Sequence, residues 1–255
     1  MDLILRAIDD LKAKLDAAPA FSEGELNRLR EHFMVEFTYH SNAIEGNTLT
    51  LRETALVVLE GLTINQKPLK DHLEAVGHKE AFDYIVAISN DKQPLSERTV
   101  KDIHALVLMG QPKDRGKYRE LSVVISGAND VPPHPIEIPL RMETLLKAYS
   151  ADNRHPIVKI ADFHIQFERI HPFIDGNGRT GRLLLNLELI KAGYAPINVK
   201  FQDRASYIDC FKDFEESRNA DKFVAMVAKY ALEELTHMYT LVMQKKETQA
   251  QNGKQ

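Results

Sequence analysis

A chain of 255 residues fits one large domain, or one domain with a helical extension. Its 44% apolar and 27% charged residues are typical of a soluble globular protein with a sizeable core, and its net charge of −4 offers no basic surface for nucleic acid or a membrane. The single cysteine, Cys210, cannot form an internal disulfide, which suits a cytoplasmic protein.

Residues 1–70 predict an N-terminal helical region. Apolar side chains at helical spacing alternate with charges at its start, which indicates an amphipathic helix and neither a signal peptide nor a membrane span. Ser22 and Glu25 form a capping box that begins a second helix. Gly46 is a natural stop for that helix, so we expect Glu45 in its last turn. A carboxylate there opposes the helix dipole unless a cation pairs with it.

The middle of the chain predicts helices interrupted by one hairpin. Around residues 121–134 a β-branched run, turn residues and prolines follow one another, which indicates a short β-hairpin. A lone hairpin is marginally stable, so we expect it to lie on the helical body. Helical patterns occupy residues 71–90, 138–149, 155–170 and 220–244, and residues 245–255 read as a disordered tail.

Residues 171–182 read HPFIDGNGRTGR and directly precede an apolar helical run. A helix N-terminus presents unpaired N–H groups to an anion, and glycines let the backbone form a concave nest around it. The two arginines lie three residues apart and reach one face of the first helical turn. This pattern predicts a polyphosphate site. Its expected binding residues are Gly176, Asn177, Gly178, Arg179 and Arg182.

Two further side chains of this stretch indicate its chemistry. Asp175 offers a hard oxygen ligand to the Mg²⁺ that usually accompanies a polyphosphate. His171 lies four residues earlier, where an imidazole can act as general base beside the phosphates.

The stretch resembles the signature of the Fic (filamentation induced by cAMP) proteins, HxFx[DE]GN[GK]RxxR, and matches it at every specified position. The resemblance implies a mainly α fold, a Fic-type helical bundle with a small β-hairpin flap, whose core spans residues 71–244. It also implies a protein adenylyltransferase. In the family the histidine deprotonates a Ser, Thr or Tyr hydroxyl of a target protein, or of the enzyme itself. That hydroxyl attacks the α-phosphate of ATP, and pyrophosphate leaves with Mg²⁺. The flap at 121–134 would dock the target by strand addition.

The segment that contains Ser41, Glu45 and Gly46 resembles [ST]xxxE[GN], the inhibitory motif of Fic proteins. By this resemblance Glu45 pairs with Arg182, takes the place of the γ-phosphate and suppresses transfer. Tyr207, by its distance from the signature, resembles an aromatic residue that family members place beside the adenine, although it can equally be a packing tyrosine. Relatives with this inhibitory arrangement often form homodimers.

Two other functions fit the same residues. Glu45 could orient a water that attacks a phosphodiester while His171 protonates the leaving hydroxyl, which would make the protein a de-AMPylating phosphodiesterase. Alternatively, Glu45 never releases, and the chain is a nucleotide-sensing interaction module whose flap docks partners.

Overall fold

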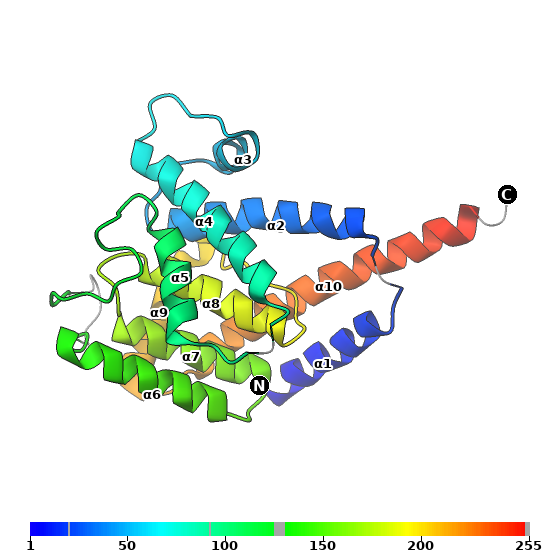
Figure 1. Cartoon of the computed structure of the whole chain (residues 1–255). Helices are drawn as coiled ribbons and strands as arrows, with labels where there is room; N and C mark the ends of the chain where they lie inside the picture. The colour runs from blue at the N-terminus through cyan, green and yellow to red at the C-terminus, as the bar shows by residue number, and fades with distance from the viewer. Residues whose placement is uncertain (20, 92, 125–130, 253–255) are drawn as a thin grey trace.

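The computed structural model describes residues 1–19, 21–91, 93–124 and 131–252, with side chains through residue 246. This part of the chain is mainly α-helical, as the sequence predicts, and contains ten α-helices and two short 3₁₀ helices (Figure 1). The helices are α1 (Asp2–Asp16), α2 (Glu23–Ile44), α3 (Leu51–Glu60), α4 (Leu69–Ile88), α5 (Glu97–Val107), η1 (Pro135–Glu137), α6 (Ile138–Ala151), α7 (Pro156–Ile170), α8 (Asn177–Lys191), η2 (Phe201–Asp203), α9 (Arg204–Ser217) and α10 (Asp221–Asn252). None of them is both long enough and apolar enough to cross a membrane.

Local capping chemistry fixes where the N-terminal helices begin. The predicted capping box of Ser22 and Glu25 is present at the start of α2, and Thr50 and Glu53 form another at the start of α3. In each box the hydroxyl accepts an N–H of the first turn while the glutamate accepts the N–H of the capping residue, so free donors at the helix end are paired. α2 ends at Ile44 and Glu45 is its C-cap, so Glu45 directly follows the last turn in which it was predicted to lie.

Helix α8 forms the centre of the molecule. It packs against α7, α4, α5 and α2, and Figure 1 shows it surrounded by these helices. Its leucines, among them Leu183, Leu184 and Leu187, are almost completely buried. Because apolar burial contributes roughly 25 cal/mol per Å², this central helix anchors the fold, and its N-terminal turn is held rigidly where the signature residues lie.

The last helix corrects the prediction of a disordered tail from residue 245. α10 continues to Asn252, and its distal part projects from the body with α1 packed along the helix (Figure 1). Lys245 pairs with Glu25 of α2 at 2.7 Å. Lysine, glutamate, glutamine and alanine are good helix formers, and no glycine or proline occurs before residue 253, so nothing in this segment ends the helix. Residues 253–255 lie outside the described chain.

The β-hairpin predicted at 121–134 is not seen in the described residues, none of which form a β-strand. Its predicted turn, residues 125–130, lies outside them. In the two arms, the carbonyls of Leu121 and Pro133 accept hydrogen bonds from the guanidinium of Arg119, at 2.9 and 2.7 Å, and not from backbone N–H groups of the opposite arm. Prolines have no N–H to donate to a ladder, which explains why the proline-rich second arm does not continue as a strand.

Candidate active site

The loop between α7 and α8 is held in a sharp turn by its own residues. Gly176 has φ +76°, and a Cβ there would lie 3.3 Å from both Val107 and Leu108 of α5. The Asn177 side chain accepts the N–H of Phe173 at 2.9 Å and donates to its carbonyl at 2.8 Å. The predicted Gly-Asn-Gly turn therefore lies at the N-terminus of α8, but Asn177 closes the loop and does not point outward.

α5 supports this loop from below. His104 accepts the N–H of Gly116 at Nδ1 (2.9 Å), so its Nε2 carries the hydrogen that bonds the Asp175 carbonyl (3.0 Å). Burial lowers the pKa of His104 to about 4, which keeps the ring neutral and this bonding pattern fixed at neutral pH. The ring also stacks on Phe173 at a centroid distance of 3.6 Å.

His171 lies at the C-cap of α7 with φ +47°, a left-handed conformation that a non-glycine residue adopts only where its surroundings hold it. The Arg119 Nε donates to the His171 carbonyl at 2.8 Å, so the same arginine that clasps the flap arms also fixes this backbone. Burial lowers the pKa of His171, and a backbone contact with Glu168 partly offsets that shift. The imidazole is therefore neutral near pH 7 and can accept a proton.

Arg182 lies in the second turn of α8 and points towards the end of α2. Its Nη2 lies 2.8 Å from Glu45 Oε1, and Nε and Nη2 also donate to the hydroxyl (3.0 Å) and carbonyl (2.8 Å) of Ser41. Arg182 is 2% exposed, whereas Glu45 is 37% exposed. Burial opposes the charge of the guanidinium, but Glu45 outweighs it and raises the pKa of Arg182. The residues of the predicted inhibitory motif and the second signature arginine thus form one cluster.

Gly178 allows this cluster to form. A Cβ at Gly178 would lie 2.3 Å from Glu45 Oε1, closer than real contacts permit, and 3.0 Å from an Arg182 nitrogen, which is a tight contact. The glutamate carboxylate therefore occupies the space directly beside the first turn of α8. Since this is the position where helix N–H groups favour an anion, Glu45 fills part of the predicted phosphate site.

Arg179, the first signature arginine, points the other way, towards α4. Its Nη1 lies 3.0 Å from Glu74 Oε1, and its Nη2 lies 3.2 Å from Asp175 Oδ1. The side chain is 2% exposed. A buried guanidinium needs paired charges, and these two carboxylates supply them. Arg179 therefore reaches the proposed anion site only through Asp175.

Asp175 is the residue that could hold a metal ion. Its Oδ1 accepts the Gly176 N–H at 2.6 Å and its Oδ2 accepts from Gln111 at 3.0 Å. Burial alone would raise its pKa, but Arg179 and these hydrogen bonds outweigh burial and lower it, so the group is ionised. With 40% of the side chain exposed, it fits Mg²⁺, which commonly takes one carboxylate together with phosphate oxygens and water. The described residues contain no cluster of three or more metal-binding side chains.

Two buried groups lie behind Arg182. Tyr207 of α9 bonds His164 Nε2 at 2.8 Å, and its ring lies 5.7 Å from the Arg182 guanidinium carbon. Glu168, one helical turn before His171, is buried, and burial raises its pKa to about 8. It is therefore an uncharged acid at neutral pH, and the carboxylate that pairs with Arg182 is Glu45.

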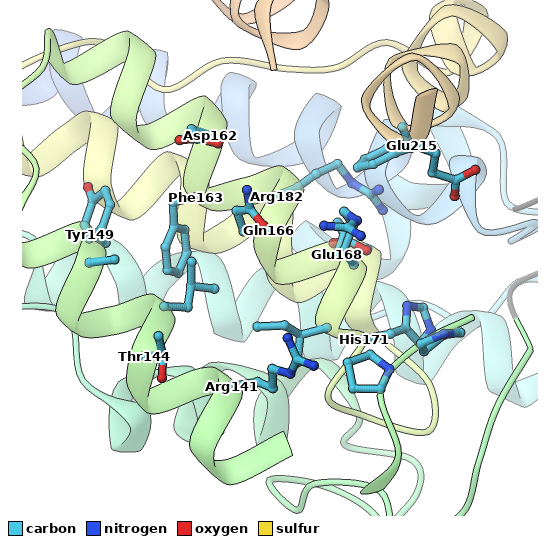
Figure 2. A pocket seen from close by; sticks show the side chains of 18 of the residues that line it. Arg141, Thr144, Tyr149, Asp162, Phe163, Gln166, Glu168, His171, Arg182 and Glu215 are labelled. Carbon is cyan, nitrogen blue, oxygen red and sulfur yellow. The ribbon is translucent and has the colours of Figure 1, made fainter. Parts of the chain in front are cut away.

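A pocket of about 1170 Å³ joins these groups. Figure 2 shows Arg182, Glu168 and His171 towards one end and Tyr149 of α6 towards the other. Of the residues predicted from the sequence, Glu45, His171, Gly178, Arg182 and Tyr207 line this pocket. The pocket lining does not include four of the predicted residues. These are Gly176 and Asn177, which form the loop between α7 and α8, and Asp175 and Arg179, which face α4.

Three site residues were not found from the sequence. Glu168 lies only three positions before His171, and a charged residue inside the apolar pattern of α7 was the available signal. Glu74 and Arg119 reach the site from α4 and from the first flap arm, and no local pattern marks them.

Comparison with known proteins gives a consistent result. Residues 94–189 match the model of the Fic/DOC family. The chain is 36% identical over 211 residues to a protein adenylyltransferase Fic of Nematostella vectensis, and 34% identical over 213 residues to that of Drosophila melanogaster, in each case over 81% of this chain. It spans 49% and 43% of those two proteins, or about half the length of the curated relatives it matches.

Solved structures agree on the fold. A Fic-domain signalling protein from Bacteroides thetaiotaomicron superposes with a TM-score of 0.86 at 27% identity, covering 93% of this chain and 97% of that one. Fic-1 from C. elegans (residues 134–508) superposes with a TM-score of 0.83 at 26% identity, covering 95% of this chain and 72% of that one.

Proposed function

Because this chain carries a domain of the Fic/DOC family, we propose that it is a protein adenylyltransferase, which moves AMP from ATP to a hydroxyl of a protein and is held inactive by Glu45. The observation that carries the proposal is the ion pair between Glu45 and Arg182 inside the pocket that His171 also lines. A base, a buried cation and a helix N-terminus around one cavity suit phosphoryl-group chemistry.

In the proposed reaction, the triphosphate lies against the first turn of α8. His171 takes the proton of the target hydroxyl, and the oxygen forms a bond to the α-phosphorus. The bond from that phosphorus to the oxygen bridging to the β-phosphate breaks, and pyrophosphate leaves with its electron pair. The lowered pKa of His171 supports its role, because a neutral ring is needed before the proton moves.

Asp175 would hold Mg²⁺ on the side of the loop that faces α4. When bound, the ion would neutralise negative charge on the phosphates. The residues of this chain then orient the ligand group: Gln111 and the Gly176 N–H each bind one oxygen of the Asp175 carboxylate, so its direction is fixed.

Inhibition follows from competition for one guanidinium. Arg182 is buried, and it needs an anionic partner, either Glu45 or a phosphate oxygen. While Glu45 lies beside Gly178, a triphosphate cannot place an oxygen there. Since Glu45 follows the last turn of α2 and stays 37% exposed, it can swing outward without disturbing the core. Ligands or partners that prefer the open state would activate transfer.

The test is labelling of proteins in a lysate with ATP that carries a radioactive α-phosphate. With Mg²⁺ present, we expect the Glu45→Gly variant to label one or more proteins and the parent to label them weakly. The matched control is the Glu45→Gly, His171→Ala double variant, which should label nothing. If the Glu45→Gly variant binds ATP but labels nothing, including itself, the proposed transfer is wrong.

The protein target is proposed to dock on the arms of the flap around residues 121–134. Apolar side chains in these arms are unusually open, with Val124 at 90% and Val131 at 84% exposure. The Arg119 clasp ties both arms to the His171 backbone, so a segment bound along the arms would lie beside the base. Main-chain pairing of an extended segment is a common way to add such a partner.

De-AMPylation is the second candidate, because Glu45 lines the same pocket as His171 while remaining partly exposed. A carboxylate so placed can orient a water towards a phosphodiester, and His171 can return a proton to the leaving hydroxyl. Wild-type protein incubated with a target labelled by the Glu45→Gly variant should then release AMP. Loss of that release in Glu45→Gln would support the hydrolytic role, and no release from the wild type would exclude it.

A homodimer is also proposed, through the face that α3 and the start of α4 form. Leu59, Leu62 and Leu69 are 43%, 51% and 71% exposed there. Exposed leucines from α3, from the loop that follows it and from the start of α4 favour an apolar interface. Light scattering should give the mass of a dimer, and Leu69→Asp should halve that mass.

A further inference from the structure

Glu74 of α4 bridges two parts of the molecule that the proposed function treats separately. Its Oε2 accepts from the Asn47 side-chain amide at 3.0 Å, and its Oε1 lies 3.0 Å from Arg179 Nη1. Asn47 comes directly after the Glu45–Gly46 pair, and Arg179 holds Asp175. One largely buried carboxylate, 13% exposed, thus contacts both the turn that carries the inhibitory glutamate and the arginine beneath the candidate metal ligand, and the exposed Lys70 lies 3.5 Å from its Oε1.

We propose that Glu74 is a positioning residue that sets both the orientation of Asp175 for Mg²⁺ and the seating of Glu45 in the phosphate site. The proposal rests on the proposed function. Neither the signature nor the inhibitory motif contains this residue, and it acts through Arg179 on one side and Asn47 on the other.

The chemistry of the two neighbours requires a carboxylate at this position. The Asn47 Nδ2 donates a hydrogen bond to Glu74, and the Arg179 guanidinium forms an ion pair with it, so a carboxylate supplies an acceptor oxygen to one neighbour and a negative charge to the other. A glutamine at 74 would have nearly the same shape but one acceptor oxygen and one NH₂ group. Whichever way the amide turned, it would offer Arg179 no negative charge, and turned one way it would also present a donor to the Asn47 amide.

The Arg179 side of this bridge affects the metal ligand through charge. Arg179 is 2% exposed and divides its contacts between Glu74 and Asp175. Without the negative charge of Glu74, the guanidinium would be neutralised by Asp175 alone, and the carboxylate would be drawn towards it. The local charge would also become more positive by one unit, which disfavours a divalent cation. Groups that orient a metal ligand in this way typically affect metal affinity 10- to 100-fold.

The Asn47 side of the bridge affects the inhibitory turn through backbone geometry. The Asn47 amide donates to the Asp71 carbonyl (3.0 Å) as well as to Glu74, its Oδ1 accepts the Leu49 N–H (3.0 Å), and its own N–H donates to the Asn42 carbonyl. These bonds fix the chain just after Gly46. Removing the Glu74 contact should loosen the turn, so that Glu45 leaves Arg182 more often.

The proposal is tested with Glu74→Gln, with Asn47→Ala to remove only the contact to the turn, and with Glu80→Gln as the control. Glu80 is an exposed residue of the same helix, so its substitution removes the same charge away from the site. The metal arm is read directly by electron paramagnetic resonance of Mn²⁺ with a non-hydrolysable ATP analogue, in the Glu45→Gly background. The effect on the turn is measured by hydrogen exchange of residues 45–50 in protein that retains Glu45.

We expect Glu74→Gln to weaken Mn²⁺ binding about tenfold and to speed exchange of residues 45–50, and Glu80→Gln to change neither. Asn47→Ala should speed exchange but leave Mn²⁺ binding within about twofold of its background. Under the proposed activity, Glu74→Gln should raise the Mg²⁺ half-saturation of AMP transfer by the same factor as the Mn²⁺ dissociation constant. If Glu74→Gln matches Glu80→Gln in both physical readouts, the assignment of Glu74 is overturned, whether or not any variant transfers AMP. If Mn²⁺ binding responds but transfer is absent throughout, the bridge stands and the proposed function fails.

Discussion

The two arginines of α8 lie three residues apart, yet their carboxylate partners differ in kind. Arg182 faces one carboxylate, Glu45, which caps the end of a helix and is 37% exposed, whereas Arg179 faces two, Glu74 of α4 at 13% exposure and Asp175 of the loop at 40%. Both guanidiniums are buried to the same extent. The difference therefore lies in the number of carboxylates on each guanidinium: under the proposed inhibition, Arg182 exchanges its single carboxylate for a phosphate, while Arg179 keeps Glu74 as a fixed partner.

This contrast explains how one short helical turn can be both rigid and switchable. The fixed side holds the loop from Phe173 to Asn177 against α5 and α4, so that the backbone N–H groups keep their direction. On the Arg182 side, only the Glu45 side chain has to move when a phosphate replaces it under the proposed inhibition. A pre-organised site loses little free energy on binding, because few groups become ordered.

The Arg179 and Arg182 sites both contribute to the proposed AMP transfer only if His171 is the general base of that reaction. In the Glu45→Gly background, His171→Ala should lower the rate of AMP transfer by about 10² to 10⁴, the usual contribution of a general base. Affinity for ATP should change little, because the phosphate contacts lie on α8. Single-turnover transfer and ATP calorimetry separate these quantities. An unchanged rate would show that another residue is the general base, and the two arginine sites would then not be organised around His171.

The exchangeable side predicts the next largest effect. Glu45→Gly should raise AMP transfer about 10- to 100-fold, because a charge-assisted hydrogen bond is worth about 1.5–3 kcal/mol and each 1.4 kcal/mol is a factor of ten. Initial rates at saturating ATP and Mg²⁺ measure it.

Glu60→Gly, near the end of α3 and distant from Arg182 in the chain, is the control for a Glu-to-Gly change at a helix end. It should leave the rate unchanged. If Glu45→Gly were no faster than this control, Arg182 would not be held by an exchangeable anion.

Sequence reasoning found the exchangeable side more completely than the fixed side. His171, Asp175 and Arg182 belong to one contiguous stretch, and Glu45 belongs to a second short motif, so both resemblances could be read along the chain. Glu74 has no motif. Its role follows from the packing of α4 on α8, and a glutamate on an amphipathic helix is ordinarily a solvated residue.

The fold was predictable where local chemistry decides it. The capping boxes at Ser22 and Thr50 set helix starts, and the structure has both. The hairpin differs because non-local contacts decide it, whereas the predicted tail continues α10 because its residues favour a helix and none of them ends it. The flap arms bond to the buried Arg119, which composition does not reveal, and Lys245 of α10 reaches back to Glu25. Contacts between residues far apart in sequence leave no periodic signal.

A pair of glycines can sharpen the comparison within α8 itself. A Cβ at Gly178 would lie 2.3 Å from Glu45 Oε1, and a Cβ at Gly181 would lie 2.3 Å from Glu168 Oε1 and 3.0 Å from the His164 ring. Glu45 is exposed and has room to move outward, whereas Glu168 is less exposed and its Oε1 is buried. Gly178→Ala should therefore weaken inhibition several-fold at little cost in stability, while Gly181→Ala should lower the free energy of unfolding by about 1–3 kcal/mol through overpacking.

Thermal unfolding and the rate of AMP transfer, measured on the same two samples, check this pair. If both substitutions lowered the free energy of unfolding equally, Glu45 would be held as tightly as Glu168. The exchangeable character of the Arg182 side would then be wrong.

The smallest effect concerns the second carboxyl near Arg182. Burial raises the pKa of Glu168 to about 8 from an ordinary value of 4.5, so the folded protein keeps this proton over a range in which the unfolded chain has lost it. Since the unfolded state binds fewer protons, stability from this group falls as the pH rises from about 4.5 to about 8. Between pH 6 and pH 7 the loss is about 1 kcal/mol, because one proton contributes up to about 1.4 kcal/mol per pH unit.

Glu168→Gln keeps the shape of the neutral acid and has no proton to lose. Relative to the parent, its free energy of unfolding should gain about 1 kcal/mol between pH 6 and pH 7, as denaturant titrations at the two pH values would show. The subtraction cancels the histidines, which titrate alike in both proteins. A constant difference would mean that Glu168 is already ionised at pH 6. Arg182 would then face two negative carboxylates, and Glu45 would no longer be the partner whose departure leaves it uncompensated.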